Sequence, residues 1–153
     1  MRRVGRKGFD VSVLMWLVGN NAIIMHMKQE TEIWLSIAKE DYKNMCAMKE
    51  TQSLRGAVLF AQQCVEKIIK AYITEYGLQP PKKIHHLEKL IEDTDLDMKE
   101  IGSPALHELS KAYGWARYPD LSSAHFNTMS QIEPLLSIAE KVYPWVLSKF
   151  KTV

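Results

Sequence analysis

The chain has 153 residues, of which 46% are hydrophobic and 25% are charged, a composition typical of one globular domain with a substantial core. The net charge is +2, but four cations fall within the first seven residues: Arg2, Arg3, Arg6 and Lys7. From Met27 onward, 16 Lys and Arg residues are balanced by 17 Asp and Glu residues. This balance excludes the broadly basic surface of a general nucleic-acid binder and leaves room only for a local basic patch.

The first 26 residues differ from the rest of the chain, and we expect residues 27–153 to form the folded domain. A basic start followed by the apolar run Val11–Val18 has the outline of a signal peptide. However, the run is too short to span a bilayer and no A-x-A cleavage site follows it. The favoured interpretation is a start codon assigned too early, with Met25 or Met27 as the initiator. A disordered arm, or an arm that packs on a partner, is the alternative.

Two long helices are predicted in the first half of the domain. Residues 32–48 carry apolar side chains at helical spacing, with Thr31 as N-cap. The expected stripe comprises Trp34, Ile37, Ala38, Tyr42 and Met45, which suit burial, and Asp41, which does not. Residues 54–76, between Ser53 and Gly77, form a second helix that is apolar on most sides. Such a helix belongs at the centre of a bundle or at a subunit interface.

Prolines divide the second half of the domain into shorter segments. After a proline-rich connection, residues 86–92 are expected to form a short helix. Ser103 and Pro104 have the pattern of an N-cap followed by a proline at the first helical position. That helix should end before Pro119, because proline disfavours helical backbone in the residue that precedes it. The following segment, up to residue 125, is expected to be a loop.

The last helix is expected to begin near Ser130, where Ser130 and Glu133 match a capping box. The chain is therefore predicted to be all-α, an antiparallel up-and-down bundle of four to five helices. Its two cysteines, Cys46 and Cys64, fall in helical patterns and outside any CxxC pair. They predict reduced thiols in an intracellular, cytoplasmic protein, with a disulfide between them as the alternative.

A narrow polar stripe crosses the otherwise apolar second helix. Gln63, Glu66, Lys67 and Lys70 recur at three- and four-residue intervals, with Gln62 at the border, so they share one helix face. The simplest interpretation is a solvated face that carries a Glu66–Lys70 ion pair. The functional interpretation is a row of amide and amine groups that contacts a ligand.

The segment Arg117–Asp120, of sequence RYPD, places an arginine at a helix C-terminus. The guanidinium there could face the terminal carbonyl groups and pair with Asp120. Alternatively, its rigid fork could bind a phosphate group. His125 follows Arg117 by eight residues. An arginine and a histidine that lie close together can cleave RNA without a metal, since the histidine transfers a proton and the arginine stabilises the developing negative charge.

The sequence gives no support for a metal site or a nucleotide loop. His85 and His86 are adjacent, so they do not share a helix face, and the other histidines lack metal-ligand spacing. The acidic run Asp93–Asp97 lacks the glycine and the final glutamate of a calcium loop. There is no GxGxxG, Walker loop, GxSxG or HExxH motif. We therefore predict neither a cofactor nor a metal.

Four of these features occur together in an order that resembles the HEPN family of small helical proteins. They are the sequence AQQCVEK (residues 61–67) with Lys70–Ala71 in the predicted helix 54–76, the triplet His85–Leu87, the segment Ala116–Asp120, and a long last helix. The match covers about residues 30–150. Each motif is moderately specific for the family, and their occurrence together in this order is a strong indication of the resemblance.

The resemblance implies a helical bundle that forms a homodimer and works beside a small nucleotidyltransferase, often encoded next to it, with a proposed nucleotide-binding role. It assigns ligand contacts to the following residues: Gln63, Glu66, Lys67, Lys70, His85, Arg117, Tyr118 and Asp120. Some members are metal-independent RNase toxins of toxin–antitoxin pairs, in which four to six residues separate the arginine from the histidine. Here seven residues, including a proline, separate Arg117 from His125, which favours binding over cleavage.

Overall fold

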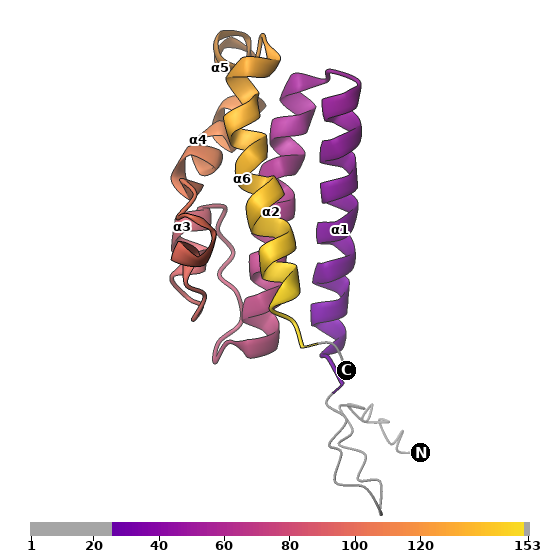
Figure 1. Ribbon diagram of the computed structural model, residues 1–153, viewed down its shortest axis with the longest axis vertical. Helices are drawn as coiled ribbons and strands as arrows, with labels where there is room; N and C mark the ends of the chain where they lie inside the picture. Colours follow the sequence, from indigo (N-terminus) through magenta and orange to yellow (C-terminus); the bar gives the residue numbers. More distant parts are fainter. Residues whose placement is uncertain (1–25, 152–153) are drawn as a thin grey trace, which may run out of the picture.

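The computed structural model describes residues 26–151, so the expectations for residues 1–25 lie outside the described residues. In the described part there are helices and no strands (Figure 1). The helices are α1 (Gln29–Glu50), α2 (Leu54–Tyr76), α3 (Leu87–Ile91), the 3-10 helix η1 (Met98–Ile101), α4 (Leu106–Arg117), α5 (Pro119–His125) and α6 (Met129–Ser148). The prediction of an all-α bundle is confirmed. The long helices α1, α2, α4 and α6 alternate in direction along the chain (Figure 1).

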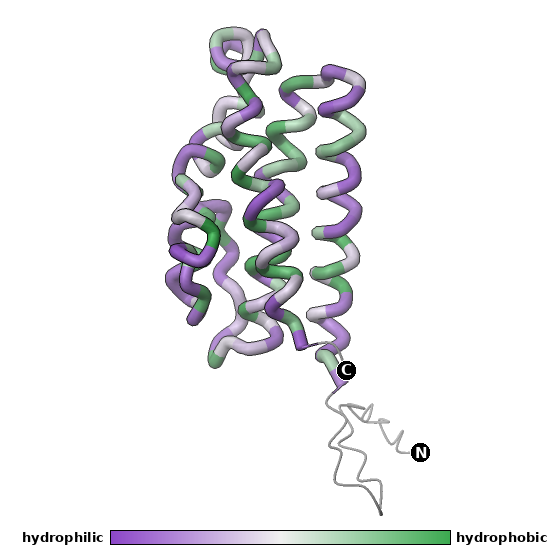
Figure 2. Tube along the Cα trace, in the orientation of Figure 1, coloured by the Kyte–Doolittle hydropathy of each residue, from purple (hydrophilic) through white to green (hydrophobic). Residues whose placement is uncertain are grey.

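Helix α2 lies at the centre of the bundle, as its sequence predicted. It packs against α1, α3, α4 and α6, and 13 of its 23 residues are buried. Figure 2 shows hydrophobic positions recurring along α2 and α6, whereas they alternate with hydrophilic positions along α1. Helix α2 therefore presents apolar side chains around most of its circumference. These side chains pack against several neighbouring helices at once, as a central helix requires.

Helix α1 extends beyond the predicted segment at both ends. Its N-cap position is Lys28 rather than Thr31, because Thr31 is buried in the first turn and donates a hydrogen bond to Glu75 Oε2 over 2.7 Å. The predicted stripe is wrong at two positions. Asp41 is buried, with 7% of its surface exposed, whereas Ile37 is 37% exposed. The cause at Asp41 is an ion pair across the α1–α2 interface, described below.

Helix α2 has the predicted bounds, but its ends differ from the expected caps. Ser53 occupies the N-cap position without a capping hydrogen bond from its side chain to the described residues. Gly77 ends the helix in extended rather than left-handed backbone, with φ −74°. A Cβ atom at Gly77 would lie 2.5 Å from the Ile73 carbonyl oxygen, so close packing rather than a positive φ angle accounts for glycine here.

Helix α4 begins at Leu106, later than the predicted start at Ser103–Pro104. Ser103 has a φ of 49°, in the left-handed region, which no N-cap adopts because a capping residue needs extended backbone. Helix α6 begins at Met129, and its capping box is formed by Thr128 and Gln131 rather than by Ser130 and Glu133. Gln131 Oε1 accepts hydrogen bonds from the backbone N–H groups of residues 127 and 128.

The expected loop between Arg117 and His125 is a helix instead, α5. Tyr118 has extended backbone, with φ −114° and ψ 127°, because the ring of Pro119 excludes helical backbone in the preceding residue. The same proline occupies the first turn of α5. Backbone N–H groups there have no acceptor within the helix, so the lack of an N–H group on proline costs no hydrogen bond. Pro119 therefore ends one helix and begins the next.

Both cysteines are free thiols, as predicted, and Cys64 is fully buried. Burial raises the pKa of the Cys64 thiol well above its usual value. Among the described helices, none has the length and apolar character needed to cross a membrane.

We predict that Ile69→Ala lowers the free energy of unfolding by about 2–5 kcal/mol, because it leaves a cavity around a fully buried side chain of the central helix. The matched control is Leu78→Ala, since Leu78 is 100% exposed and its truncation should change stability by less than about 0.5 kcal/mol. Urea unfolding followed by circular dichroism measures both. Equal effects of the two substitutions would contradict the central position of α2.

Candidate functional site

The polar stripe of α2 contains a buried ion pair rather than a solvated one. Lys70 Nζ lies 2.7 Å from Glu66 Oε1, and each residue is only 6% exposed. Gln62, fully buried one turn earlier, donates from Nε2 to Glu66 Oε2 over 3.0 Å. The interpretation as a solvated face is therefore wrong at Glu66 and Lys70, although the ion pair itself is present.

His85 joins this cluster from the connection before α3. Its Nδ1 lies 3.0 Å from Glu66 Oε2, and its carbonyl oxygen accepts a hydrogen bond from Gln62 Nε2 over 3.1 Å. Burial tends to raise the pKa of Glu66, but hydrogen bonds from Lys70, His85 and Gln62 outweigh it, so the pKa lies below its ordinary value. Glu66 is thus a buried carboxylate held in its charged form.

The other stripe residues turn towards α1 or remain without a described contact. Lys67 Nζ lies 2.8 Å from Asp41 Oδ2 on α1. Lys70 Nζ also lies 5.8 Å from the centre of the Trp34 ring. Gln63 is half-buried, and its side chain makes no hydrogen bond within residues 26–151. Both amines of the stripe are therefore neutralised by carboxylates of the same bundle.

Arg117 ends α4 as predicted, but it forms no ion pair with Asp120. Within the described chain its guanidinium makes no ion pair, and it lies 5.4 Å from the ring centre of Tyr113, one helical turn earlier. The Tyr113 ring in turn lies 5.2 Å from the ring of His85. Arg117 is consequently linked through two aromatic rings to the group formed by Gln62, Glu66, Lys70 and His85, which we call the Glu66 cluster. Tyr118 and Asp120 are exposed beside Arg117.

Arg55 lies next to Arg117, although sequence analysis did not identify it. Its Nη1 donates to the Ala116 carbonyl oxygen over 3.0 Å, so it caps the C-terminus of α4 from the first turn of α2. No motif marks Arg55. Only the alternating helix directions, which bring the start of α2 to the end of α4, could have indicated this contact.

The two arginines share a cavity of about 500 Å³, which we call the arginine cavity. It is lined by Arg55, Ala116, Arg117, Pro119, Ser122, Ser123, Phe126 and Asn127. None of these residues is acidic, whereas both of the cations carry guanidinium groups. The cavity therefore has a local positive charge, of the kind that an anion requires.

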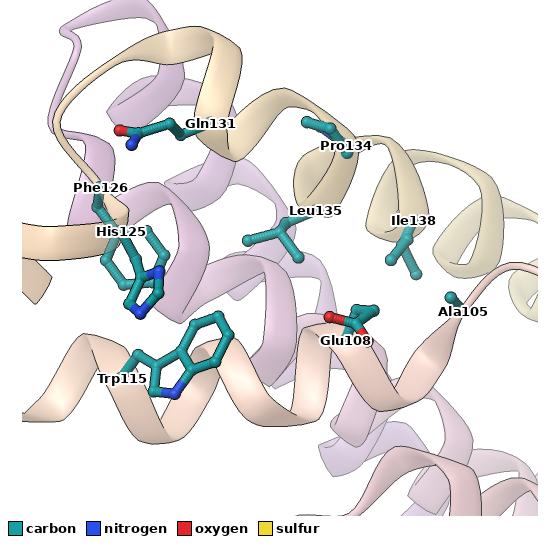
Figure 3. Close-up of a pocket in the computed structure, with 9 residues that line it drawn as sticks. All are labelled: Ala105, Glu108, Trp115, His125, Phe126, Gln131, Pro134, Leu135 and Ile138. Carbon is teal, nitrogen blue, oxygen red and sulfur yellow. The ribbon is translucent and has the colours of Figure 1, made fainter. Parts of the chain in front are cut away.

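His125 lies in a second cavity of about 470 Å³, which we call the tryptophan cavity. It is lined by Ala105, Glu108, Trp115, His125, Phe126, Gln131, Pro134, Leu135 and Ile138 (Figure 3). The His125 ring stacks on Trp115, with ring centres 4.0 Å apart and an angle of 12° between the planes. Phe126 lines both cavities, but Arg117 and His125 do not line the same one.

Two further histidines, His86 and His107, lie next to neighbouring carboxylates. His86 Nδ1 lies 3.5 Å from Glu88, and His107 Nε2 lies 2.8 Å from Glu108. Across residues 26–151 there is no group of three or more His, Cys, Asp or Glu side chains arranged to hold a metal ion.

We predict that Lys70→Met lowers the free energy of unfolding by about 3–5 kcal/mol at neutral pH, because it leaves the buried Glu66 carboxylate without its cation. In the wild type, Glu66 has a lowered folded pKa, so its stabilising contribution is present above about pH 4.3 and is lost as pH falls through the folded value. The deficit of the variant should therefore shrink in acid, when Glu66 is protonated.

Urea unfolding at neutral pH and at about pH 3.5 tests this expectation. The control is Lys141→Met on α6, an exposed lysine, for which we expect a change below about 0.5 kcal/mol at both pH values. A Lys70→Met variant as stable as this control would show that the ion pair is not important for the fold.

The family of the chain follows from a comparison of its sequence with family models. No curated protein and no solved structure matches the chain significantly. One family model, described as the HEPN domain, matches residues 31–149. That range runs from the first turn of α1 to the end of α6 and includes both cavities and the Glu66 cluster. The chain therefore belongs to the HEPN domain family.

Proposed function

We propose that the protein is a HEPN module that binds a nucleotide through its phosphates in the arginine cavity, forms a homodimer and partners a small nucleotidyltransferase. The observation that carries the binding function is the pair of arginines around one cavity that has no acidic lining residue. Family membership supports the dimer and the partner. No metal or cofactor takes part in this proposal.

Charge compensation distinguishes the arginine cavity from the polar stripe of α2. Lys67 and Lys70 are each within 2.8 Å of a carboxylate, so a phosphate would have to compete with a bonded anion for either amine. Arg117 has no such competitor among the described residues. Arg55 uses one nitrogen on a carbonyl oxygen, which leaves the rest of its planar fork for a phosphate.

The polar groups around the arginines set the geometry of the cavity. Ser122 and Ser123 donate their hydroxyl protons to the carbonyl oxygens of Trp115 and Asp120. The Ser122 hydroxyl therefore fixes the turn between α4 and α5, the Ser123 hydroxyl bonds within α5, and the two guanidinium groups supply the donors for an anion. Guanidinium groups bind phosphate through two parallel hydrogen bonds, which gives direction as well as charge.

The same geometry supports binding better than RNA cleavage. A general acid or base must come within hydrogen-bond reach of the reacting atoms that the arginine holds. His125 instead stacks on Trp115 and lines the tryptophan cavity, whereas Arg117 lines the arginine cavity. Metal-independent RNase activity through Arg117 and His125 would need these two side chains to act at one point.

We predict that Arg117→Ala and Arg55→Ala each weaken the binding of ATP by about 10- to 100-fold, the range expected for the loss of a charge-assisted hydrogen bond. Isothermal titration calorimetry with ATP and with inorganic tripolyphosphate measures the effect. Lys43→Ala, an exposed cation on α1, is the control and should bind like the wild type. Arg117→Lys should recover only part of the affinity, because lysine lacks the planar fork.

Binding that is equally weak in the wild type and in the Arg117 variants would contradict the proposal. Arg55→Ala also removes the hydrogen bond to Ala116, so its unfolding free energy should be measured alongside. Arg117 makes no hydrogen bond within the described chain, and its substitution is therefore the cleaner test.

Helix α1 offers a surface for the proposed homodimer. It packs mainly on α2, and it exposes Ile33 and Ile37, one turn apart, by 54% and 37%. Residues four apart lie on the same face of a helix. Two exposed isoleucines on one face are costly in a monomer, and their burial against a second copy would remove that cost.

We predict that the double substitution Ile33→Glu and Ile37→Glu converts a dimer into a monomer in sedimentation equilibrium, because it places four like charges in the interface, while the helical content is unchanged. Lys39→Glu is the control for the added charge on exposed α1. Co-purification with a small nucleotidyltransferase produced together with this chain tests the partner. A monomeric wild type that captures no such enzyme would contradict this part of the proposal.

A further inference from the structure

The tryptophan cavity has the walls of a site for a flat ring. At one end, the stacked rings of Trp115 and His125 close the cavity (Figure 3). Along its length, Pro134, Leu135 and Ile138 of α6 form an apolar side (Figure 3). Bases stack on aromatic side chains and are excluded from water by aliphatic ones, largely irrespective of base identity.

The tryptophan cavity adjoins the arginine cavity. Phe126, which directly follows α5, lines both of them. Helix α5 carries Ser122 and Ser123 towards the arginine cavity and His125 towards the tryptophan cavity. The cationic cavity and the aromatic cavity thus lie on either side of the short helix α5, much as the phosphates and the base lie at opposite ends of a nucleotide.

The polar groups of the tryptophan cavity are suited to the edge of a base rather than to a second phosphate. Glu108 lies on the same face of α4 as Trp115, two turns earlier. Its Oε1 is within 2.8 Å of His107 Nε2 and 3.2 Å of Lys111 Nζ, whereas its Oε2 has no partner among residues 26–151. A carboxylate repels phosphate and accepts hydrogen bonds from amino groups.

Gln131 contributes the complementary donor. Its Oε1 is occupied by two backbone N–H groups at the start of α6, so the Nε2 amide group is the part that remains for a ligand within the described structure. Figure 3 shows Gln131 near His125 at one end of the cavity and Glu108 near Ala105 at the other, so the two side chains would contact different parts of a ligand. Glu108 is the acceptor for an amino group, and Gln131 is a donor at the aromatic end.

We propose that the tryptophan cavity is the base subsite of the nucleotide site and that it selects a base with an exocyclic amino group, such as adenine. This inference rests on the proposed function, because it assigns the phosphates of the same ligand to the arginine cavity. The base packs against the Trp115–His125 stack, and Glu108 accepts a hydrogen bond from its amino group.

Calorimetry with ATP, UTP and inorganic tripolyphosphate tests the subsite. Wild type should bind ATP about tenfold more tightly than UTP, which lacks the amino group, and more tightly still than tripolyphosphate, which lacks a base. Glu108→Gln should abolish the preference of ATP over UTP, because an amide both donates and accepts. Glu40→Gln on α1, also an exposed position, is the matched control and should keep the preference.

Tryptophan emission gives a second readout. Adenosine should quench part of the emission in wild type and in Trp145→Phe, since Trp145 lies outside the cavity. It should not quench in Trp115→Phe. If that variant does not fold, the Glu108→Gln comparison still decides, because Glu108 is partly exposed and its ion pairs within residues 26–151 are with neighbouring side chains of α4.

The possible results separate the two proposals. Tripolyphosphate that binds as tightly as ATP, with unchanged tryptophan emission, overturns the base subsite and leaves phosphate binding at the arginines intact. Adenosine that quenches Trp115 while tripolyphosphate does not bind supports the subsite and overturns the proposed function. If adenosine, ATP and tripolyphosphate all fail to bind, both proposals are overturned.

Discussion

The ring of Pro119 constrains the geometry on which the candidate site depends. It excludes helical backbone at Tyr118, so α4 ends at Arg117 and α5 departs in a new direction. The guanidinium of Arg117 is therefore presented beside Arg55 instead of continuing along a helix. The same break places His125 back against Trp115, one residue before Phe126. A continuous helix through this segment would remove the wall that the two cavities share.

The Glu66 cluster fixes a second part of the candidate site, the connection before α3. Glu66 accepts hydrogen bonds from Lys70 and Gln62 and lies 3.0 Å from His85, so the connection before α3 is fixed to the central helix. His85 then supports the Tyr113 ring, over which Arg117 lies. A buried ion pair contributes little net stability relative to an apolar core, but the loss of one partner is costly. The cluster is thus better understood as a fixed support for the site than as a ligand contact.

The sequence was most informative where periodicity and burial coincide. The bounds of α2 and its central position could be predicted because its side chains are apolar on most sides, and the packing in the structure agrees with that pattern. Caps were predicted less well, because Ser103 adopts left-handed backbone and because Thr128 and Gln131, rather than Ser130 and Glu133, form the capping box of α6. At the site, Arg117 and His125 were identified from motifs. Arg55 and Glu108 were not, because their roles arise from contacts between helices distant in sequence.

In the proposed site, Arg55 and Arg117 together receive the anionic part of a ligand. The most direct measurement is side-chain nitrogen NMR of the arginine Nε–Hε groups during a titration with ATP, with assignment by Arg→Lys substitution. We expect the signals of both arginines to shift together and to saturate at one concentration, while the Lys67 and Lys70 amines, held by Asp41 and Glu66, stay unchanged. Shifts confined to the α2 lysines, with both arginine signals stationary, would contradict the account.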